Sequence, residues 1–350
     1  MRVLKRVVSR RGGGPAAEWP TSTPEGVSLD GAALRALGDA IARGELGNIH
    51  ALLLVRDGVL AFERYFAGDD WALVEPLGRV EFGPDTLHDL RSVTKSLVGA
   101  LVGIAHGDGA IPDLDVPLVT FFPEYAKRHG RALEGRTLRH ALTMTAGLSW
   151  DELSHPYWDP RNDENGMWSA ADPLDYALSR TPVAPGGARF AYNGGMPVVL
   201  AAVVERTTGK PLDVFARERL LDPLGIGDAE WVQHQSRIFV AASGLRLRPR
   251  DLARFGQLML DGGAFAGRQI VPADYARASL EPLVETHGGF APSYGYQWWV
   301  GGIPLALGNG GQRVALLGRA RTVIVAHAGA YDSPTNGVER VLETAIAAIH

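Results

Sequence analysis

The sequence places a serine and a lysine three residues apart, Ser92 and Lys95, at the start of an apolar segment. Positions i and i+3 share one face of a helix, so the lysine amine would lie beside the serine hydroxyl. A serine needs a nearby base to act as a nucleophile, and a lysine desolvated by neighbours such as Leu97 has a lowered pKa and can act as a neutral amine. Arginine cannot take this role. The pair therefore predicts a serine nucleophile with a lysine base, at a helix start whose free N–H groups favour an oxyanion.

The tetrapeptide alone also fits a plainer interpretation, in which Ser92 is a helix N-cap and Lys95 is a solvated surface charge. Two observations favour the interpretation of Ser92 and Lys95 as a catalytic pair. Residues 97–104 are apolar on nearly every side, so the first turn of this helix is expected to be buried, where an idle lysine would be costly. No other lysine of the chain has a serine three residues before it.

The chain around this pair resembles a known enzyme family. Residues 90–96, Leu-Arg-Ser-Val-Thr-Lys-Ser, and residues 107–115, with Gly-Asp-Gly-Ala-Ile and Leu-Asp, resemble the Ser-x-x-Lys helix and following turn of β-lactamase-related serine hydrolases, such as class C β-lactamases and penicillin-binding proteins. Residues 137–148 resemble the segment that leads into the helical lobe of that family. The resemblance implies an α/β (α+β) fold of β-lactamase/transpeptidase type, an antiparallel sheet flanked by helices with an inserted, mostly helical lobe.

Two further motifs follow in the order of the family. Residues 185–193, Pro-Gly-Gly-Ala-Arg-Phe-Ala-Tyr-Asn, resemble the stretch that carries the second motif, Tyr-x-Asn, with Tyr192 as its tyrosine. Residues 308–313, Gly-Asn-Gly-Gly-Gln-Arg, stand where the third motif, Lys-Thr-Gly or His-x-Gly, would lie on a sheet-edge strand. The resemblance covers roughly residues 25–345, and motifs in the right order over this length are a more specific signal than any single motif.

The resemblance implies a role for each motif. Tyr192 would relay a proton between the nucleophile and the leaving group, and the backbone N–H groups of Ser92 and Gln312 would form the oxyanion hole. The plainer alternatives are a half-buried tyrosine that anchors a turn and glycines of an ordinary loop. The residues of the third motif are Asn309, Gly310, Gly311 and Gln312.

The Gly-Gly-Gln form of the third motif and the long segment after Gly147 are closest to the 6-aminohexanoate-dimer hydrolase and esterase-like branch of the family. Two positions depart from its penicillin-processing members. Gly194 stands where such an enzyme presents an asparagine amide, and Asn309 lacks the cationic or imidazole group that holds the carboxylate of the antibiotic. We therefore predict a serine hydrolase that cleaves an ester or amide of a small molecule through an acyl-enzyme, as a carboxylesterase or a 6-aminohexanoate-oligomer-hydrolase-like amidase.

Three alternatives are weighed against this prediction. A β-lactamase or D-amino-acid peptidase would share the motifs. A catalytically silent binding or sensor protein of the same fold need not keep Ser92, Lys95 and Tyr192 together, so their joint presence argues against it. A Ser-His-Asp hydrolase of the α/β class would need Gly-x-Ser-x-Gly after a strand, and the sequence has no such pentapeptide.

Residues 149–168 are long, polar and aromatic without clear periodicity, as active-site lids often are. We name Trp150, Asp151 and Trp158 in this segment, together with Asn193 of the second motif, as candidates to line the substrate pocket. The alternative is a solvent-exposed excursion whose tryptophans cover the helical lobe, and the sequence does not decide between the two.

Composition limits the partners. The 350 residues are 46% hydrophobic and 21% charged, as in an ordinary folded protein. The net charge is −4 without a long basic run, so we expect a small-molecule ester or amide as partner, with no nucleic acid and no membrane. The absence of cysteine excludes disulfides and thiolate chemistry.

We expect neither a metal nor a cofactor. The histidines, among them His50, His88 and His140, lack His-x-x-x-His or acidic spacing, and no glycine-rich turn has the strand and helix of a nucleotide cradle. No apolar run suits a secretion signal or a bilayer span, so a cytoplasmic protein is expected, with export left open. The sequence does not distinguish a monomer from a homodimer.

Hydrophobic periodicity predicts a helix at 31–43 and a hairpin of strands at 49–55 and 59–66, turned by Asp57-Gly58. A short strand at 86–90 is expected to lead into the Ser92 helix. Further helices are predicted at 251–260, 273–280 and 335–349, and further strands at 296–300, 313–317 and 322–326.

Strands at both ends of the chain with helices between them imply a sheet assembled from distant segments. We predict a flexible tail at 1–22, a discontinuous sheet domain at 23–91 and 236–350, and a mostly helical domain at 92–235. The active site would lie between these two domains.

Overall fold

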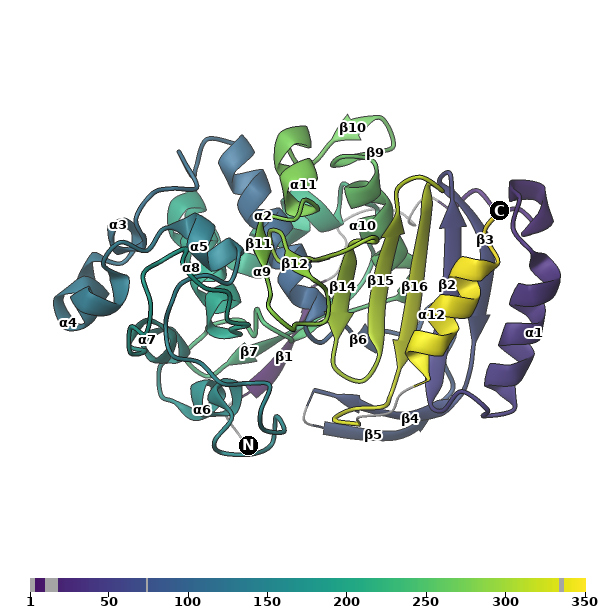
Figure 1. The fold of residues 1–350 in the computed structure, drawn as a ribbon, viewed down its shortest axis with the longest axis horizontal. Helices are drawn as coiled ribbons and strands as arrows, with labels where there is room; N and C mark the ends of the chain where they lie inside the picture. Colours follow the sequence, from purple (N-terminus) through teal and green to yellow (C-terminus); the bar gives the residue numbers. More distant parts are fainter. Residues whose placement is uncertain (1–3, 10–17, 74, 334–336) are drawn as a thin grey trace.

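The computed structural model describes residues 4–9, 18–73, 75–333 and 337–350 of the chain. A large antiparallel sheet occupies one side of the molecule and a mostly helical lobe the other (Figure 1). This arrangement confirms the predicted antiparallel sheet flanked by helices with an inserted helical lobe. Within the described ranges, no helix combines the length and the apolar character needed to cross a membrane.

The large sheet joins the two ends of the chain, because the late strand β16 pairs with the early strand β2. Asp57 and Gly58, both at positive φ, form the predicted turn between β2 and β3. In spatial order the strands are β11 (Val284–Glu285), β12 (Ser293–Tyr294), β13 (Trp299–Val300), β14 (Leu305–Gly308), β15 (Gln312–Leu317), β16 (Thr322–Ala328), β2 (Ile49–Arg56) and β3 (Val59–Tyr65).

Both faces of this sheet are covered, so its central strands β2 and β16 are buried along almost their whole length and are mostly apolar. Side chains alternate across a strand: Leu52 and Leu54 pack in a cluster with α1 (Gly31–Ala42) and α12 (Val338–Ala347), and Leu53 packs in the main core. Helix α10 (Pro249–Leu260) contributes to that main core, and the predicted helices at 31–43, 251–260 and 335–349 correspond to these three.

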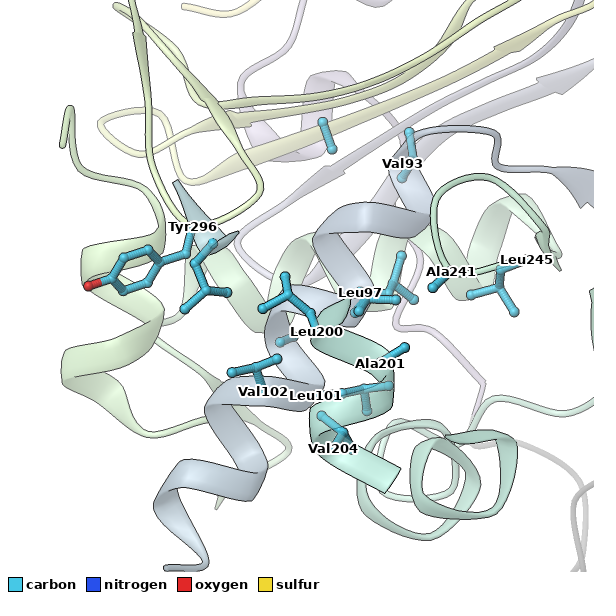
Figure 2. Close-up of a cluster of buried hydrophobic side chains, with 14 of the residues drawn as sticks. Val93, Leu97, Leu101, Val102, Leu200, Ala201, Val204, Ala241, Leu245 and Tyr296 are labelled. Atoms are coloured by element: carbon cyan, nitrogen blue, oxygen red, sulfur yellow. The ribbon is translucent and has the colours of Figure 1, made fainter. Parts of the chain in front are cut away.

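Helix α2 (Val93–Gly107) is enclosed, since every residue from Val93 to Ala105 is buried. Figure 2 shows Leu97 and Leu101 of α2 beside residues of α8 (Gly195–Thr208). The remaining helical elements are the 3₁₀ turn η1 (Glu25–Val27), α3 (Leu118–Phe121), α4 (Pro123–Leu133), α5 (Leu138–Leu142), α6 (Asp163–Ser169), α7 (Pro173–Leu178), α9 (Leu212–Ala216), the π-helical turn η2 (Arg217–Leu221) and α11 (Ala273–Ser279).

Three smaller sheets complete the described structure. One has the order β1–β7–β8–β6, and β6 leads directly to the Ser92 helix. The other two are hairpins, β4 with β5 and β9 with β10. Their bounds are β1 (Leu4–Ser9), β4 (Gly68–Ala72), β5 (Glu75–Val80), β6 (His88–Asp89), β7 (Ala229–His234), β8 (Leu245–Leu247), β9 (Ala264–Phe265) and β10 (Arg268–Gln269).

Residues 4–9 of the predicted flexible tail form β1, which pairs with β7 along all six residues. The rest of that tail before Glu18 lies outside the described residues. The strand predicted at 296–300 is reduced to β13, since Gln297 adopts a positive φ and its N–H bonds to the carbonyl of Leu142 instead of a strand. The domain division at residue 235 stays a prediction, and β7 and β8 share one sheet across it.

Gly103 in α2 allows the close approach of Tyr275 in α11, whose hydroxyl donates to the carbonyl of Gly99 at 2.7 Å. A Cβ on Gly103 would lie 2.3 Å from the Tyr275 ring. Such overpacking costs roughly 1–3 kcal/mol, and alanine gains only about 1 kcal/mol over glycine in a helix.

We expect Gly103→Ala to lower the free energy of unfolding, measured by denaturant titration. Gly130→Ala in α4 is the control, because a Cβ there meets nothing within 4 Å, and it should be neutral or stabilising. Equal stability of the two variants would show that the α2–α11 contact adapts without cost.

Candidate active site

Ser92 stands at the N-cap of α2, yet its hydroxyl caps no backbone N–H. The hydroxyl oxygen instead lies 2.9 Å from the Nζ atom of Lys95. Arg91, the residue before it, adopts a positive φ of 48°, an uncommon conformation for a long side chain, and this turn leads from β6 into the helix. The geometry therefore differs from that of an ordinary serine N-cap.

Lys95 is buried, with only 1% of its surface exposed. Its Nζ donates to the carbonyl of Ala242 at 3.0 Å and lies 4.9 Å from the centre of the Tyr192 ring. The interpretation of Lys95 as a solvated surface charge is therefore wrong. The amine is enclosed by the protein, and its two polar contacts are the Ser92 hydroxyl and the carbonyl of Ala242.

Tyr192 comes just before α8 and completes a cluster with Ser92 and Lys95. Desolvation raises the pKa of its phenol well above the ordinary value, with a further rise from Glu152, while a hydrogen bond with Ser92 opposes the shift. Its ring stacks on Trp299 with the centroids 5.4 Å apart. The phenol is therefore protonated at neutral pH and placed to donate its proton.

Two buried glutamates, Glu152 and Glu164, lie behind this cluster. Glu152 accepts hydrogen bonds from the Trp150 indole and from the backbone N–H of Gly194, both at 2.5 Å. Glu164 accepts one from the Ser243 hydroxyl at 2.9 Å. Burial raises the pKa of Glu152 to about 7, against the attraction of Lys95 and with a further rise from Glu164.

The glutamate pair explains why glycine occupies the third position of the second motif. A Cβ on Gly194 would lie 2.8 Å from a carboxylate oxygen of Glu152 and 3.0 Å from one of Glu164. The two carboxyl groups thus fill the space that an asparagine side chain would need. The departure noted at Gly194 is a packing requirement of this chain.

The third motif follows β14, beside the nucleophile. A Cβ on Gly308 would lie 2.5 Å from the carbonyl oxygen of Leu90, so this end of the strand packs directly against the segment that leads to Ser92. Gly310 and Gly311 adopt positive φ angles of 86° and 99°, which favour glycine. These two glycines therefore shape the turn into β15.

The side chains of the third motif are held by the protein. Asn309 donates from its amide to Asp332 at 2.7 Å. The Gln312 amide is fully buried, donating to the carbonyl of Ala328 at 2.6 Å and contacting His327 at 2.8 Å. The side chain of Gln312 is therefore held by the protein, and the role of its backbone N–H in an oxyanion hole stays a prediction.

The four pocket candidates differ in their surroundings. Trp150 contacts Glu152 near the cluster, as described above. Asn193 is buried and accepts from the N–H of Gly195 at 2.8 Å, Asp151 is exposed and accepts from Ser154, and Trp158 is 71% exposed. Asn193 and Asp151 thus each accept a hydrogen bond from a nearby backbone N–H group. That any of the four residues contacts the substrate stays a prediction.

Sequence reasoning did not assign the carboxyl pair or the carbonyl of Ala242. Glu152 and Glu164 both lie in the 149–168 segment, and Tyr157 of this segment interacts electrostatically with Glu152, Tyr192 and Asp332. The segment therefore reaches the second motif, and its role as a lid stays a prediction. Burial of two acidic residues in a polar segment leaves no local signal in a single sequence.

Comparison with known proteins agrees with this architecture. Residues 49–347 match the family described as Beta-lactamase. The 6-aminohexanoate-dimer hydrolase of Paenarthrobacter ureafaciens is 32% identical over 322 residues, covering 85% of this chain and 77% of that protein. Esterase EstB of Burkholderia gladioli is 32% identical over 229 residues, covering 62% of this chain and 56% of that protein.

The fold is shared with solved structures. A Bacillus anthracis protein provisionally named as a 6-aminohexanoate-dimer hydrolase superposes with a TM-score of 0.78 at 23% identity, covering 99% of this chain and 90% of that one. The fold and the Ser-x-x-Lys site define a serine hydrolase that acts on ester or amide bonds. This chain belongs to the β-lactamase family.

The buried Glu152 makes stability depend on pH. Its pKa rises from an ordinary 4.5 to about 7 on folding, so between these values the native state holds a proton that the unfolded state has lost. The contribution of this group is thus fully present below about pH 4.5 and is lost as the pH rises toward 7.

We expect Glu152→Gln to gain stability relative to the wild type as the pH increases from 4.5 to 7, and to keep a constant difference above that. Denaturation midpoints at a series of pH values measure this. Glu134→Gln, at an exposed position, is the control. Parallel curves for wild type and Glu152→Gln would contradict the raised pKa.

Proposed function

We propose that this protein hydrolyses an ester or linear amide bond of a small molecule through an acyl-enzyme on Ser92. The observation that carries the proposal is the 2.9 Å contact between the Ser92 hydroxyl and the buried amine of Lys95. A nucleophile and a base within hydrogen-bond reach, enclosed away from bulk water, form the basic unit of covalent catalysis.

Lys95 and Tyr192 are proposed to move the protons. As a neutral amine, Lys95 would donate one hydrogen to the carbonyl of Ala242 and direct its lone pair at the Ser92 hydroxyl. Ser92 would then attack the substrate carbonyl as its proton passes to Lys95. The protonated Tyr192 phenol, which contacts Ser92, would supply the proton that the leaving group needs.

The oxyanion of the tetrahedral intermediate would be held by the backbone N–H groups of Ser92 and Gln312. The packing of Gly308 against Leu90 supports this, because it brings the third motif beside the start of α2. Collapse of the intermediate releases the alcohol or amine and leaves Ser92 acylated. Once the leaving group has departed, the proton on Lys95 would pass to the Tyr192 phenolate, which restores the neutral amine and the phenol. Lys95 would then take a proton from the attacking water and return it to Ser92 as the acid is released.

The surroundings favour a substrate with an apolar part and without a carboxylate at the third motif. Tyr192 stacks on the buried ring of Trp299, and the 68% exposed Phe290 packs edge-on against Trp299 at 5.2 Å, so the cluster is next to a group of aromatic side chains. Asn309 is bonded to the carboxylate of Asp332, which repels an anionic group. These features support an ester or linear amide over a lactam antibiotic.

The relatives support the same range of substrates. One is named for hydrolysis of a 6-aminohexanoate dimer, a linear amide, and the other is named an esterase. We therefore propose a carboxylesterase or an amidase of linear oligomers as the activity of this chain. A small-molecule ester or amide is the proposed partner.

The nucleophile can be tested by intact mass spectrometry after exposure to a p-nitrophenyl acyl ester and, separately, to a fluorophosphonate. We expect one adduct on wild type and on the surface control Ser169→Ala, and none on Ser92→Ala. Turnover should fall in Ser92→Ala by at least about a hundredfold, since such nucleophiles carry several orders of magnitude. An adduct on Ser92→Ala, or none on folded wild type, would overturn the proposal.

The base can be tested with Lys95→Arg, which keeps a cation but cannot supply a neutral amine. We expect acylation by the ester to slow by roughly 10²–10⁴-fold, the usual contribution of a general base. Lys210→Arg, at an exposed position paired with Glu218, should acylate at the wild-type rate. Wild-type rates in Lys95→Arg would exclude the neutral-amine role.

A further inference from the structure

Two histidines and an aspartate meet in the interior, on elements that the proposed mechanism does not use. His50 lies on β2, Asp70 on β4 and His88 on β6, and each is at most 1% exposed. One ligand atom from each lies within 4.8 Å of the others. Three strands from three different sheets thus bring nitrogen and oxygen donors to one buried point.

The hydrogen bonds of His88 determine which of its nitrogens carries the proton. Its Nδ1 lies 3.0 Å from the carbonyl oxygen of Asp89. A carbonyl oxygen only accepts, so Nδ1 must carry the hydrogen, and the Nε2 of the neutral imidazole is left with a bare lone pair. That lone pair points at the Nδ1 of His50, 2.8 Å away.

The hydrogen bonds of His50 likewise determine which of its nitrogens carries the proton. Its Nε2 lies 3.0 Å from the Oδ1 of Asn48, and the Asn48 amide nitrogen donates to the carbonyl of Asp69 at 2.8 Å. The amide orientation is thereby set, Oδ1 accepts, and Nε2 of His50 carries the hydrogen. The Nδ1 of the neutral imidazole is then also bare. Two lone pairs facing each other at 2.8 Å need a positive charge between them.

Asp70 adds a negative charge to the same point. One carboxylate oxygen accepts from the Tyr331 hydroxyl at 2.6 Å and lies 3.9 Å from Nε2 of His88. The other is buried without a hydrogen-bond partner among the described residues. A buried carboxylate oxygen without a partner is costly, and a cation beside it removes that cost.

We propose that His50 Nδ1, His88 Nε2 and the Asp70 carboxylate bind a divalent transition-metal ion, with zinc the best match to two imidazoles and one carboxylate. Zinc–nitrogen bonds of about 2.0–2.1 Å require the two nitrogens to separate to roughly 3.3 Å. The outer bonds to Asp89, Asn48 and Tyr331 are those that orient metal ligands in proteins.

Neutral imidazole is the form that binds metals, and the outer hydrogen bonds of His50 and His88 leave one nitrogen of each ring free to face the ion. A tetrahedral ion would have one further position. His327 stacks on His88 with the centroids 4.4 Å apart, and its buried Nε2 has no hydrogen-bond partner among the described residues. His327 is outside the group of ligand atoms that lie within 4.8 Å of one another, so a water molecule would complete the coordination.

The ion would have a structural role close to the site. It would fasten the β4–β5 hairpin to β2, and it would hold His88 four residues before Ser92. A surface hollow of about 740 Å³ is lined by Asn48, which bonds to His50, and by Asp69, which precedes Asp70 in the chain. The proposal departs from the sequence-based expectation of no metal, because these ligands are dispersed over three strands without local spacing.

The test uses the full chain, treated with a chelator, dialysed and then titrated with Co²⁺ alone and with Zn²⁺ alone. We expect one equivalent of each ion to bind, visible absorption bands of tetrahedral Co²⁺, and a higher thermal midpoint with Zn²⁺ than without it. These readouts need no substrate, so they stand or fall separately from the hydrolase proposal.

Asp70→Asn keeps the shape of the side chain but removes its negative charge. It should weaken Co²⁺ binding by at least about tenfold, because loss of a direct metal ligand costs more than loss of a residue that only hydrogen-bonds to a ligand. His287→Gln, which removes an exposed histidine beside Glu285, should keep one equivalent. If Asp70→Asn does not fold, the wild-type titration decides alone. Folded wild type without Co²⁺ or Zn²⁺ binding would overturn the proposal and leave a proton between the imidazoles.

Discussion

The amine of Lys95 is the constraint around which the site is organised. Placing a basic group in the interior is costly unless polar partners surround it, and each partner here comes from a different part of the chain. Ser92 lies on the same helix, the carbonyl of Ala242 comes from the segment before β8, and Glu152 comes from the 149–168 segment. Three separate segments of the chain therefore meet at one nitrogen atom.

Local sequence features carried much of the prediction. The Asp57-Gly58 turn, the helices α1 and α10, and the approach of Lys95 to Ser92 all depend on spacing within a dozen residues, which periodicity and turn chemistry describe well. The order of the motifs indicated the fold, because a family likeness sums weak signals over most of the chain.

Features set by long-range contacts could not be predicted in this way. Strand β1 depends on pairing with β7, more than two hundred residues later, and the strands β11 to β13 are only two residues long. The convergence of Glu152 and Glu164 on Gly194 depends on burial that a polar segment does not indicate. The meeting of His50 with His88 likewise depends on strands from separate sheets.

The pairing of β16 with β2 has a consequence for folding during synthesis on the ribosome. During synthesis Ser92 and Lys95 leave the ribosome early, whereas Thr322–Ala328, which closes the sheet, is among the last segments to be made. Until then the edge of β2 that pairs with β16 has no partner strand, and the third motif at 309–312 is itself made only shortly before β16. A nascent or truncated chain thus carries the reactive pair without the rest of its site, so hydrolytic competence arises only when both ends of the polypeptide have come together.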